Sequence, residues 1–168
     1  VVFTSDHGFN LGEHGLWQKS SLWTDVTRVP LIIYMPKARA NGGRSTRIVE
    51  LLDLYPTVAD LAGLQIPREV EGRTLRPLLS NSKLRWNHPA RSQVPGGRSV
   101  RFQNWRYSEW GKNGEKGVEL YNVQEDPGEY RNLAALPQYA SVIASLKPML
   151  PSEPPPSTAP KLPPERGD

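Results

Sequence analysis

The chain opens with Val1-Val2-Phe3-Thr4-Ser5-Asp6-His7-Gly8, in which an apolar, β-branched run ends in a cluster of polar side chains. Short apolar runs of this kind are typical of buried strands. In open α/β sheets, ligands bind beyond the carboxyl ends of the strands, which is where Asp6, His7 and Gly8 stand. The stretch therefore predicts a buried strand of an α/β domain, whose polar end is well placed for a metal or an anion.

The pair Asp6 and His7 has two interpretations. A carboxylate and a neutral imidazole are both metal ligands, and Gly8 lets the chain turn away without a side chain in the way. Alternatively, Asp6 caps a turn and His7 bonds a backbone carbonyl. The residue types alone leave both interpretations open.

The segment from Gly8 to Lys19 is rich in glycine and is predicted to be a loop. If this loop folds back, the Lys19 ammonium reaches the same pocket as Asp6, as a compact charge for a sulfate or phosphate oxygen. The alternative is a solvated surface lysine. His14 is a second candidate, because an imidazole can donate a proton to a leaving group near neutral pH. A structural role, stacking on Trp17 or bonding the loop backbone, is the alternative for His14.

Further along the chain, residues 31–35 predict a second buried strand and residues 48–64 predict a helix, since apolar residues recur there every three or four positions. Gly63 is expected to end that helix. The predicted buried face of the helix comprises Leu51, Leu54, Tyr55, Val58, Leu61 and Ala62.

A polar stretch at residues 80–97 separates this region from a different pattern. Short strands are predicted at residues 99–102, 105–110 and 118–122, followed by a helix at residues 138–146. Trp105, Tyr107 and Trp110 are expected to share one face of their strand. Arg98, Arg101 and Arg106 are candidates for binding a sulfated sugar, with a solvated strand edge as the alternative.

The predicted order of elements is that of an α/β domain end followed by a small α+β unit. Residues 1–85 form the α/β portion. Residues 86–150 form a small subdomain of antiparallel strands with a closing helix. Residues 151–168 are rich in proline and are predicted to be a disordered tail.

Composition narrows the classes of function. The net charge is +4, and the basic residues are scattered rather than gathered in runs, which does not favour a nucleic-acid binder. The chain has no cysteine, which excludes disulfides and thiolate metal sites within it. It also has no apolar stretch of about 18 residues, which a membrane-spanning helix needs.

A series of motifs in collinear order resembles the C-terminal half of the sulfatase family, most closely its iduronate-2-sulfatase and choline-sulfatase-like branches. The motifs are Val1–Gly8, Leu11–Lys19, Arg28–Ile32, Leu52–Leu64, Glu71–Leu75, Glu119–Asn122, Glu125–Glu129 and Arg131–Ala134. Together they cover residues 1 to about 150. Any one match is weak, whereas the ordered series is specific.

The resemblance implies an alkaline-phosphatase-like α/β sandwich with a small C-terminal sheet subdomain. It implies hydrolysis of a sulfate monoester at a divalent cation, usually calcium. Asp6 and His7 match one pair of the family's metal ligands, and Lys19 matches the lysine that contacts the sulfate. The family's formylglycine nucleophile, made from a cysteine or serine, and its first carboxylate pair have no counterpart in this chain.

These implications lead to several expectations. The start in mid-strand predicts that the protein begins further upstream. The resemblance implies that the complete enzyme acts on a sulfated carbohydrate outside the cytoplasm, in the periplasm, the lysosome or the secreted fraction. Because the nucleophile has no counterpart here, this chain alone is expected to be inactive. A ring nitrogen at His7 leaves manganese or zinc open besides calcium. The alternatives are a phosphonate or phosphodiester hydrolase of the same superfamily and a non-catalytic remnant module. The sequence does not decide the oligomeric state.

Overall fold

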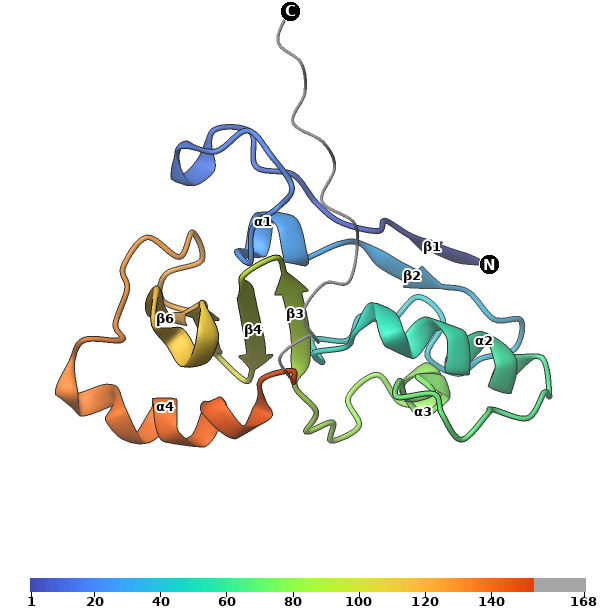
Figure 1. Ribbon diagram of the computed structural model, residues 1–168. Coiled ribbons are helices and arrows are strands. Elements are labelled where there is room, and N and C mark those ends of the chain that lie inside the picture. The colour runs from blue at the N-terminus through green and yellow to red at the C-terminus, as the bar shows by residue number, and fades with distance from the viewer. Residues whose placement is uncertain (153–168) are drawn as a thin grey trace, which may run out of the picture.

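The computed structural model describes residues 1–152, whose strands form a two-stranded and a four-stranded sheet (Figure 1). The strands are β1 (Val2–Thr4), β2 (Leu31–Ile33), β3 (Ala90–Val94), β4 (Gly97–Phe102), β5 (Trp105–Trp110) and β6 (Gly117–Asn122). The helices are α1 (Thr24–Thr27), α2 (Leu54–Leu61), α3 (Arg76–Ser80) and α4 (Ala140–Leu146). Short 3-10 turns lie at Glu13–Gly15, Leu51–Asp53, Lys112–Gly114, Pro137–Tyr139 and Lys147–Met149. Within these residues, no helix is long and apolar enough to cross a membrane.

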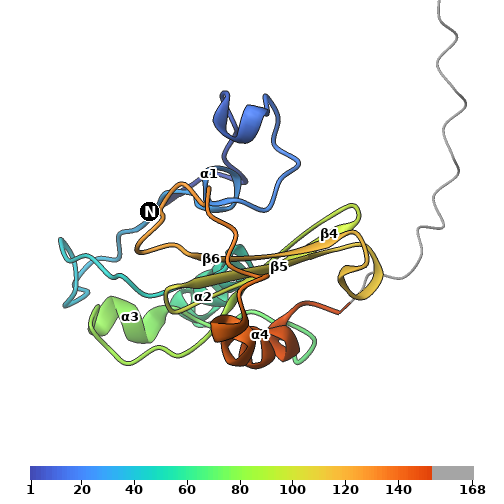
Figure 2. The ribbon, with the colours of Figure 1, turned by 90° about the vertical axis from the view of Figure 1, so that its left-hand side faces the viewer.

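The four-stranded sheet is an antiparallel meander in the order β3-β4-β5-β6. Figure 2 shows this sheet edge-on as a layer between α4 on one side and the N-terminal loop with α1 on the other. The register places Val100 opposite Tyr107 and Tyr107 opposite Leu120, so these three side chains point to the same face. The sheet is therefore covered on both faces.

The face of the sheet toward α4 carries the apolar core. Val100, Tyr107 and Leu120 are at most 2% exposed, and Leu146 of α4 closes over them at 1%. Burial of such side chains is the main stabilising term available to a small domain. The predicted strands at residues 99–102, 105–110 and 118–122 are confirmed, and so is the closing helix.

The opposite face of the sheet is polar. The Ser108 hydroxyl donates to the Ser99 hydroxyl at 2.9 Å, and both side chains are fully buried. The Trp110 ring and the Leu22 side chain lie against Gly97 on this face, where a Cβ at Gly97 would come within 2.5 Å of the ring. The expectation that Trp110 shares a face with Tyr107 is wrong, because residues three positions apart on a strand point to opposite sides.

The strand β3 was not predicted, since residues 80–97 appeared only polar and turn-rich. Its sequence, Ala90–Val94, is mostly polar, and it forms an edge strand paired with β4. Gly96 makes the connecting turn possible with φ of 77°, in the region that favours glycine. Residues 153–168, most of the predicted tail, lie outside the described residues, and the division between residues 85 and 86 stays a prediction.

The strands β1 and β2 pair antiparallel, with Phe3 opposite Ile32. The prediction that both are buried is wrong for the described residues, because Phe3 is 58% exposed and Ile32 is 61% exposed. Among residues 1–152, no element covers the face of this two-stranded sheet that carries Phe3 and Ile32. An apolar run predicts a strand, but burial requires a covering element.

The predicted helix at residues 48–64 is confirmed as a 3-10 turn followed by α2, and Gly63 ends it with φ of 72°. Its predicted buried face is wrong, since Tyr55 is 58% exposed and Val58 is 50% exposed. The buried side combines Pro56 and Ala59 with polar groups. Asp53 accepts from the backbone N–H of Arg73 at 2.8 Å, and the Thr57 hydroxyl accepts from that of Leu75 at 2.8 Å.

Candidate functional site

The loop that follows β1 folds back on itself. The Gly8 N–H donates to the Val26 carbonyl at 2.7 Å, and the Asn10 N–H donates to the Gln18 carbonyl at 3.0 Å. A Cβ at Gly8 would lie 1.9 Å from the Asp25 carbonyl oxygen, so only glycine permits this close approach. The loop thus folds back, which is the condition under which Lys19 could reach Asp6, and the backbone next to Lys19 runs beside the residues that follow His7.

A buried side-chain contact reinforces the folded loop. The Ser21 hydroxyl donates to the Asn10 side-chain carbonyl at 2.8 Å, and Asn10 and Ser21 are 0% and 2% exposed. The Lys19 side chain is exposed. The direction of its ammonium toward Asp6 stays a prediction, while the backbone on which it stands is well held.

Asp6 and His7 lie side by side at the end of β1. The His7 N–H donates to Asp6 Oδ1 at 3.0 Å, and this backbone hydrogen bond is the main reason that the pKa of Asp6 is lowered. His7 Nδ1 lies 2.7 Å from the Gly8 carbonyl oxygen. Since a carbonyl can only accept, Nδ1 carries the hydrogen. In the neutral ring, Nε2 then presents its lone pair, 3.5 Å from Asp6 Oδ2.

This arrangement fits one side of a divalent cation site. A backbone carbonyl on Nδ1 is the partner that orients metal-binding histidines, and it leaves Nε2 and a carboxylate oxygen available as ligands. Calcium takes about six to eight oxygen ligands, so two side chains do not complete its shell. Among residues 1–152 there is no group of three or more His, Cys, Asp or Glu side chains that could hold a metal. Both sequence interpretations of the pair are compatible with these contacts.

His14 lies between aromatic rings. Its ring stacks on Trp23 at 3.9 Å between centroids and on Tyr130 at 4.8 Å. The stacking partner is therefore Trp23 and not Trp17, as the structural alternative had expected. His14 takes φ of 53°, and its Nε2 is buried without a hydrogen-bond partner among the described residues. A proton-donating role for His14 stays a prediction.

The sequence did not identify the buried ion pair between Arg106 and Glu129. Glu129 is 1% exposed and Arg106 is 4% exposed, and Arg106 Nε donates to Glu129 Oε1 at 2.5 Å. The other carboxylate oxygen of Glu129 accepts from the Thr24 N–H at 2.6 Å. Arg106 is thus neither at a solvated edge nor open to a sugar. The one signal in the sequence is that Glu129 ends the motif Glu125–Glu129.

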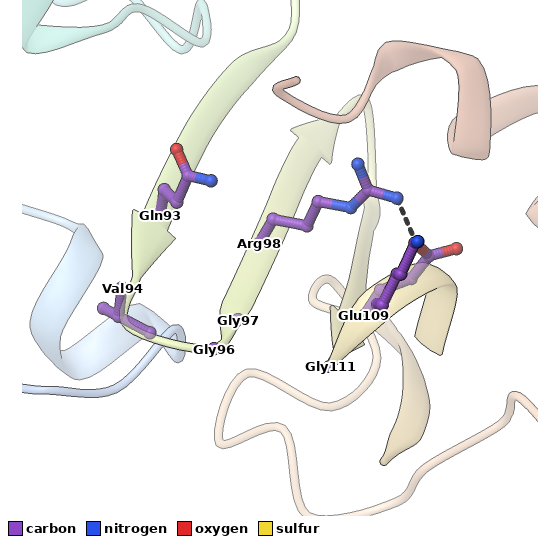
Figure 3. Close-up of a pocket in the computed structure, with 8 residues that line it drawn as sticks. Gln93, Val94, Gly96, Gly97, Arg98, Glu109 and Gly111 are labelled. Atoms are coloured by element: carbon purple, nitrogen blue, oxygen red, sulfur yellow. Dashed lines mark hydrogen bonds and ion pairs between the residues drawn. The ribbon is translucent and has the colours of Figure 1, made fainter. Parts of the chain in front are cut away.

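A cavity of about 210 Å³ opens near the β3–β4 turn (Figure 3). Arg98 and Glu109 line it and form an ion pair at 2.7 Å. Burial alone would raise the pKa of Glu109, but hydrogen bonds from Arg98, Tyr107 and Lys147 outweigh it and lower that pKa. Asp6, His7, His14 and Lys19 do not line this cavity.

Comparison with known proteins identifies the family. Residues 12–153 match the family described as N-sulphoglucosamine sulphohydrolase, C-terminal. An N-acetylglucosamine-6-O-sulfatase of Bacteroides thetaiotaomicron is 34% identical over 152 residues, which are 83% of this chain and 27% of that protein.

Two solved structures share the fold. One is a protein in complex with its substrate D-glucosamine-2-N,6-O-disulfate, with a TM-score of 0.78 at 31% identity over 88% of this chain and 32% of that chain. Another is a phosphonate monoester hydrolase from Silicibacter pomeroyi, with a TM-score of 0.71 at 28% identity over 88% of this chain and 33% of that chain.

The chain therefore spans between about a quarter and a third of the length of these relatives. The predicted α/β fold class, that of the alkaline-phosphatase-like sulfatases, is confirmed. Lys19 and His14 lie inside the range matched to the family, whereas Asp6 and His7 precede it. Because residues 12–153 match this C-terminal domain, the chain belongs to the sulfatase family.

Proposed function

We propose that this chain is the C-terminal part of a sulfatase that hydrolyses sulfate monoesters of a sulfated carbohydrate. The observation that carries the proposal is the geometry at the end of β1. The Gly8 carbonyl holds the hydrogen on His7 Nδ1 and leaves Nε2 beside the Asp6 carboxylate, at the start of the folded loop on which Lys19 stands. The sulfated glucosamine bound by a structurally similar protein supports the substrate class.

Each residue has a defined task in this proposal. Asp6 and His7 hold the divalent cation, and when bound the cation offsets the charge of the sulfate group and of the nucleophile. The Lys19 ammonium donates to sulfate oxygens and stabilises the negative charge that builds on them in the transition state. His14 is the second candidate, as a proton donor to the leaving alcohol. The nucleophile, a formylglycine, comes from the part of the protein upstream of this chain.

The proposal is tested by the turnover of 4-nitrophenyl sulfate. Purified residues 1–168 should release no sulfate, because the nucleophile is not in this chain. In the complete protein, Lys19→Ala should lower kcat/KM by about a hundredfold or more, in the range seen when a transition-state donor is removed. Lys83→Ala, at an exposed lysine outside the loop, is the matched control. Near wild-type turnover of Lys19→Ala would remove this lysine from the site.

The metal is tested on the same complete protein. Treatment with a chelator should abolish turnover, and calcium should restore it better than manganese or zinc. Asp6→Asn should weaken the apparent affinity for the restoring metal, since it replaces a charged oxygen ligand by a neutral one. If only zinc or manganese restored turnover, the proposed site at Asp6 and His7 would stand, but its metal would not be calcium.

A second candidate is a phosphonate monoester hydrolase of the same fold. The structural likeness to the Silicibacter pomeroyi enzyme, at 28% identity, favours it over other hydrolase classes. Parallel assays of an aryl sulfate and an aryl phosphonate monoester with the complete protein separate the two. A complete protein that turns over neither ester, with its metal present, would instead support a non-catalytic remnant.

The place of action is also a proposal. By resemblance to sulfatases, the complete protein is expected outside the cytoplasm. Cell fractionation with an antibody to residues 86–150 would test this, and recovery in the cytoplasmic fraction alone would contradict it.

A further inference from the structure

Two adjacent residues of the C-terminal region contact both sides of the loop that carries Lys19. The Tyr130 ring stacks on His14, with centroids 4.8 Å apart, and the Glu129 carboxylate accepts from the Thr24 N–H at 2.6 Å. Lys19 lies midway between His14 and Thr24 in the sequence. The segment of residues 14–24, called the lysine loop below, is therefore held at both ends by one dipeptide.

The ends of the lysine loop also contact one another. His14 and Trp23 stack at 3.9 Å with their planes only 7° apart. The three rings Tyr130, His14 and Trp23 thus form a continuous stack, and stacked aromatic pairs contribute beyond the area they bury. Because Trp23 directly precedes Thr24, the stack and the carboxylate contact meet at one place. The base of the loop is closed there.

The Glu129 contact is supported from the sheet. Arg106 on β5 donates to Glu129 through Nε. Its Nη2 donates to the hydroxyls of Thr24 at 3.2 Å and Thr27 at 3.0 Å. Both members of the ion pair therefore bind α1, which follows the lysine loop. Charge-assisted hydrogen bonds in a buried place are stronger and more directional than neutral ones.

The backbone around Glu129 is shaped for these contacts. Glu129 takes φ of 56°, a conformation that costs energy for a residue other than glycine. A Cβ at Gly128 would lie 2.5 Å from the Tyr130 ring, so glycine leaves the room in which that ring sits. The turn is closed by the Glu129 N–H, which donates to the Asp126 carbonyl at 3.0 Å. The contacts of Glu129 with Arg106 and Thr24 maintain this conformation.

We propose that Glu129 and Tyr130 act as a clamp that positions Lys19 for its anion. The clamp itself rests on the contacts above, and its role in the reaction rests on the proposed function of Lys19. A binding group must be held within about 0.5 Å of its productive position, and a glycine-containing loop does not supply that by itself. In this proposal Glu129 and Tyr130 are positioning residues, and Arg106 of β5 connects them to the C-terminal sheet.

The clamp is tested first without any activity, by limited trypsin digestion of residues 1–168. Because proteases cleave locally opened chain, we expect trypsin to cut after Lys19 mainly when the loop opens. Tyr130→Ala and Glu129→Gln should each speed cleavage at Lys19 by about tenfold, because cleavage follows the population of the open loop. Tyr130→Phe keeps the ring and should digest like the parent chain. Near-ultraviolet circular dichroism checks that the sheet stays folded.

Tyr130 is 69% exposed, so Tyr130→Ala keeps the test decisive even where Glu129→Gln fails to fold. Unchanged cleavage at Lys19 in Tyr130→Ala would overturn the clamp. So would equal acceleration in Tyr130→Phe, because the stacked ring would then not be the feature that holds the loop.

The second test uses the complete protein and 4-nitrophenyl sulfate. Tyr130→Ala should lower kcat/KM by about tenfold with Lys19 present, and should change nothing further in a Lys19→Ala background, since residues that act as a unit are not additive. Equal losses in both backgrounds would overturn a role through Lys19. A complete protein without sulfatase activity would refute the proposed function, while the digestion result would still decide the clamp.

Discussion

The apolar residues of the C-terminal sheet and those of β1, β2 and the outer side of α2 differ in burial. In the sheet, Val100 and Leu120 are fully buried against α4. In β1, β2 and α2, Phe3, Ile32 and Tyr55 are each more than half exposed, although β1 and β2 are richer in apolar residues than the strands of the sheet. The comparison shows that an apolar run specifies a strand or a helix face, while burial depends on a second layer being present to cover it.

The two regions also differ in what holds them. The sheet and α4 share an apolar core, whereas the N-terminal region is joined to the sheet by hydrogen bonds as well as by the packing of Leu22 against Gly97. The Arg91 N–H donates to the Glu50 carboxylate at 2.6 Å, and the Thr24 N–H donates to Glu129 at 2.6 Å. Such contacts are directional, so they fix an orientation.

The largest contrast is expected between the two kinds of ion pair. Arg106→Ala leaves Glu129 charged and buried without its partner, and should lower the free energy of unfolding by about 3–5 kcal/mol. Arg76→Ala breaks an exposed pair with Asp60 in the N-terminal region and should have a much smaller effect. Urea unfolding followed by circular dichroism measures both. Similar losses would contradict the picture of one buried and one solvated pair.

An intermediate contrast concerns apolar side chains. Leu120→Ala should cost about 3 kcal/mol, because it opens a cavity in the core of the sheet. Phe3→Ala, at a strand that is exposed in residues 1–152, should change stability by no more than about 0.5 kcal/mol. The same unfolding experiment compares them. If Phe3→Ala cost as much as Leu120→Ala, the outer side of β1 would have to be covered in solution.

The smallest contrast is one of pH, on the polar face of the sheet. Burial is the main reason that the pKa of Glu119 is raised, against a hydrogen bond from Trp110 that lowers it. The folded chain therefore binds this proton more tightly than the unfolded chain. Its stability gains as the pH falls through the raised pKa, and above that pKa the buried charge destabilises the fold.

Glu119→Gln removes that charge. It should raise the free energy of unfolding by about 0.5 kcal/mol at pH 7, a small gain because the side chain is partly solvated. The gain should vanish below about pH 4, where the carboxyl is neutral in both states. Glu125→Gln, at an exposed glutamate, is the control. A gain that is equal at both pH values would exclude ionisation as its cause.

Local patterns in the sequence predicted the elements well and their environment poorly. Alternation and turn residues identified β4, β5, β6 and the closing helix, because those signals lie within a few positions of one another. The edge strand β3 was missed, since its mostly polar sequence forms a strand only by pairing with β4. The buried face of α2 was wrong for a similar reason. Asp53 and Thr57 are buried there because backbone N–H groups near residue 74 need acceptors.

The candidate site divides in the same way. The adjacency of Asp6 and His7 and the glycines of the loop are local, so the sequence by itself determined that these residues adjoin and predicted which of them would offer metal and anion ligands. Only the tertiary structure decided that the loop closes through Trp23 and that Glu129 and Tyr130 hold it. Those contacts join positions 105 residues apart, between Glu129 and Thr24. A contact at that distance depends on which surfaces meet after folding, and no local period or spacing in the chain records it.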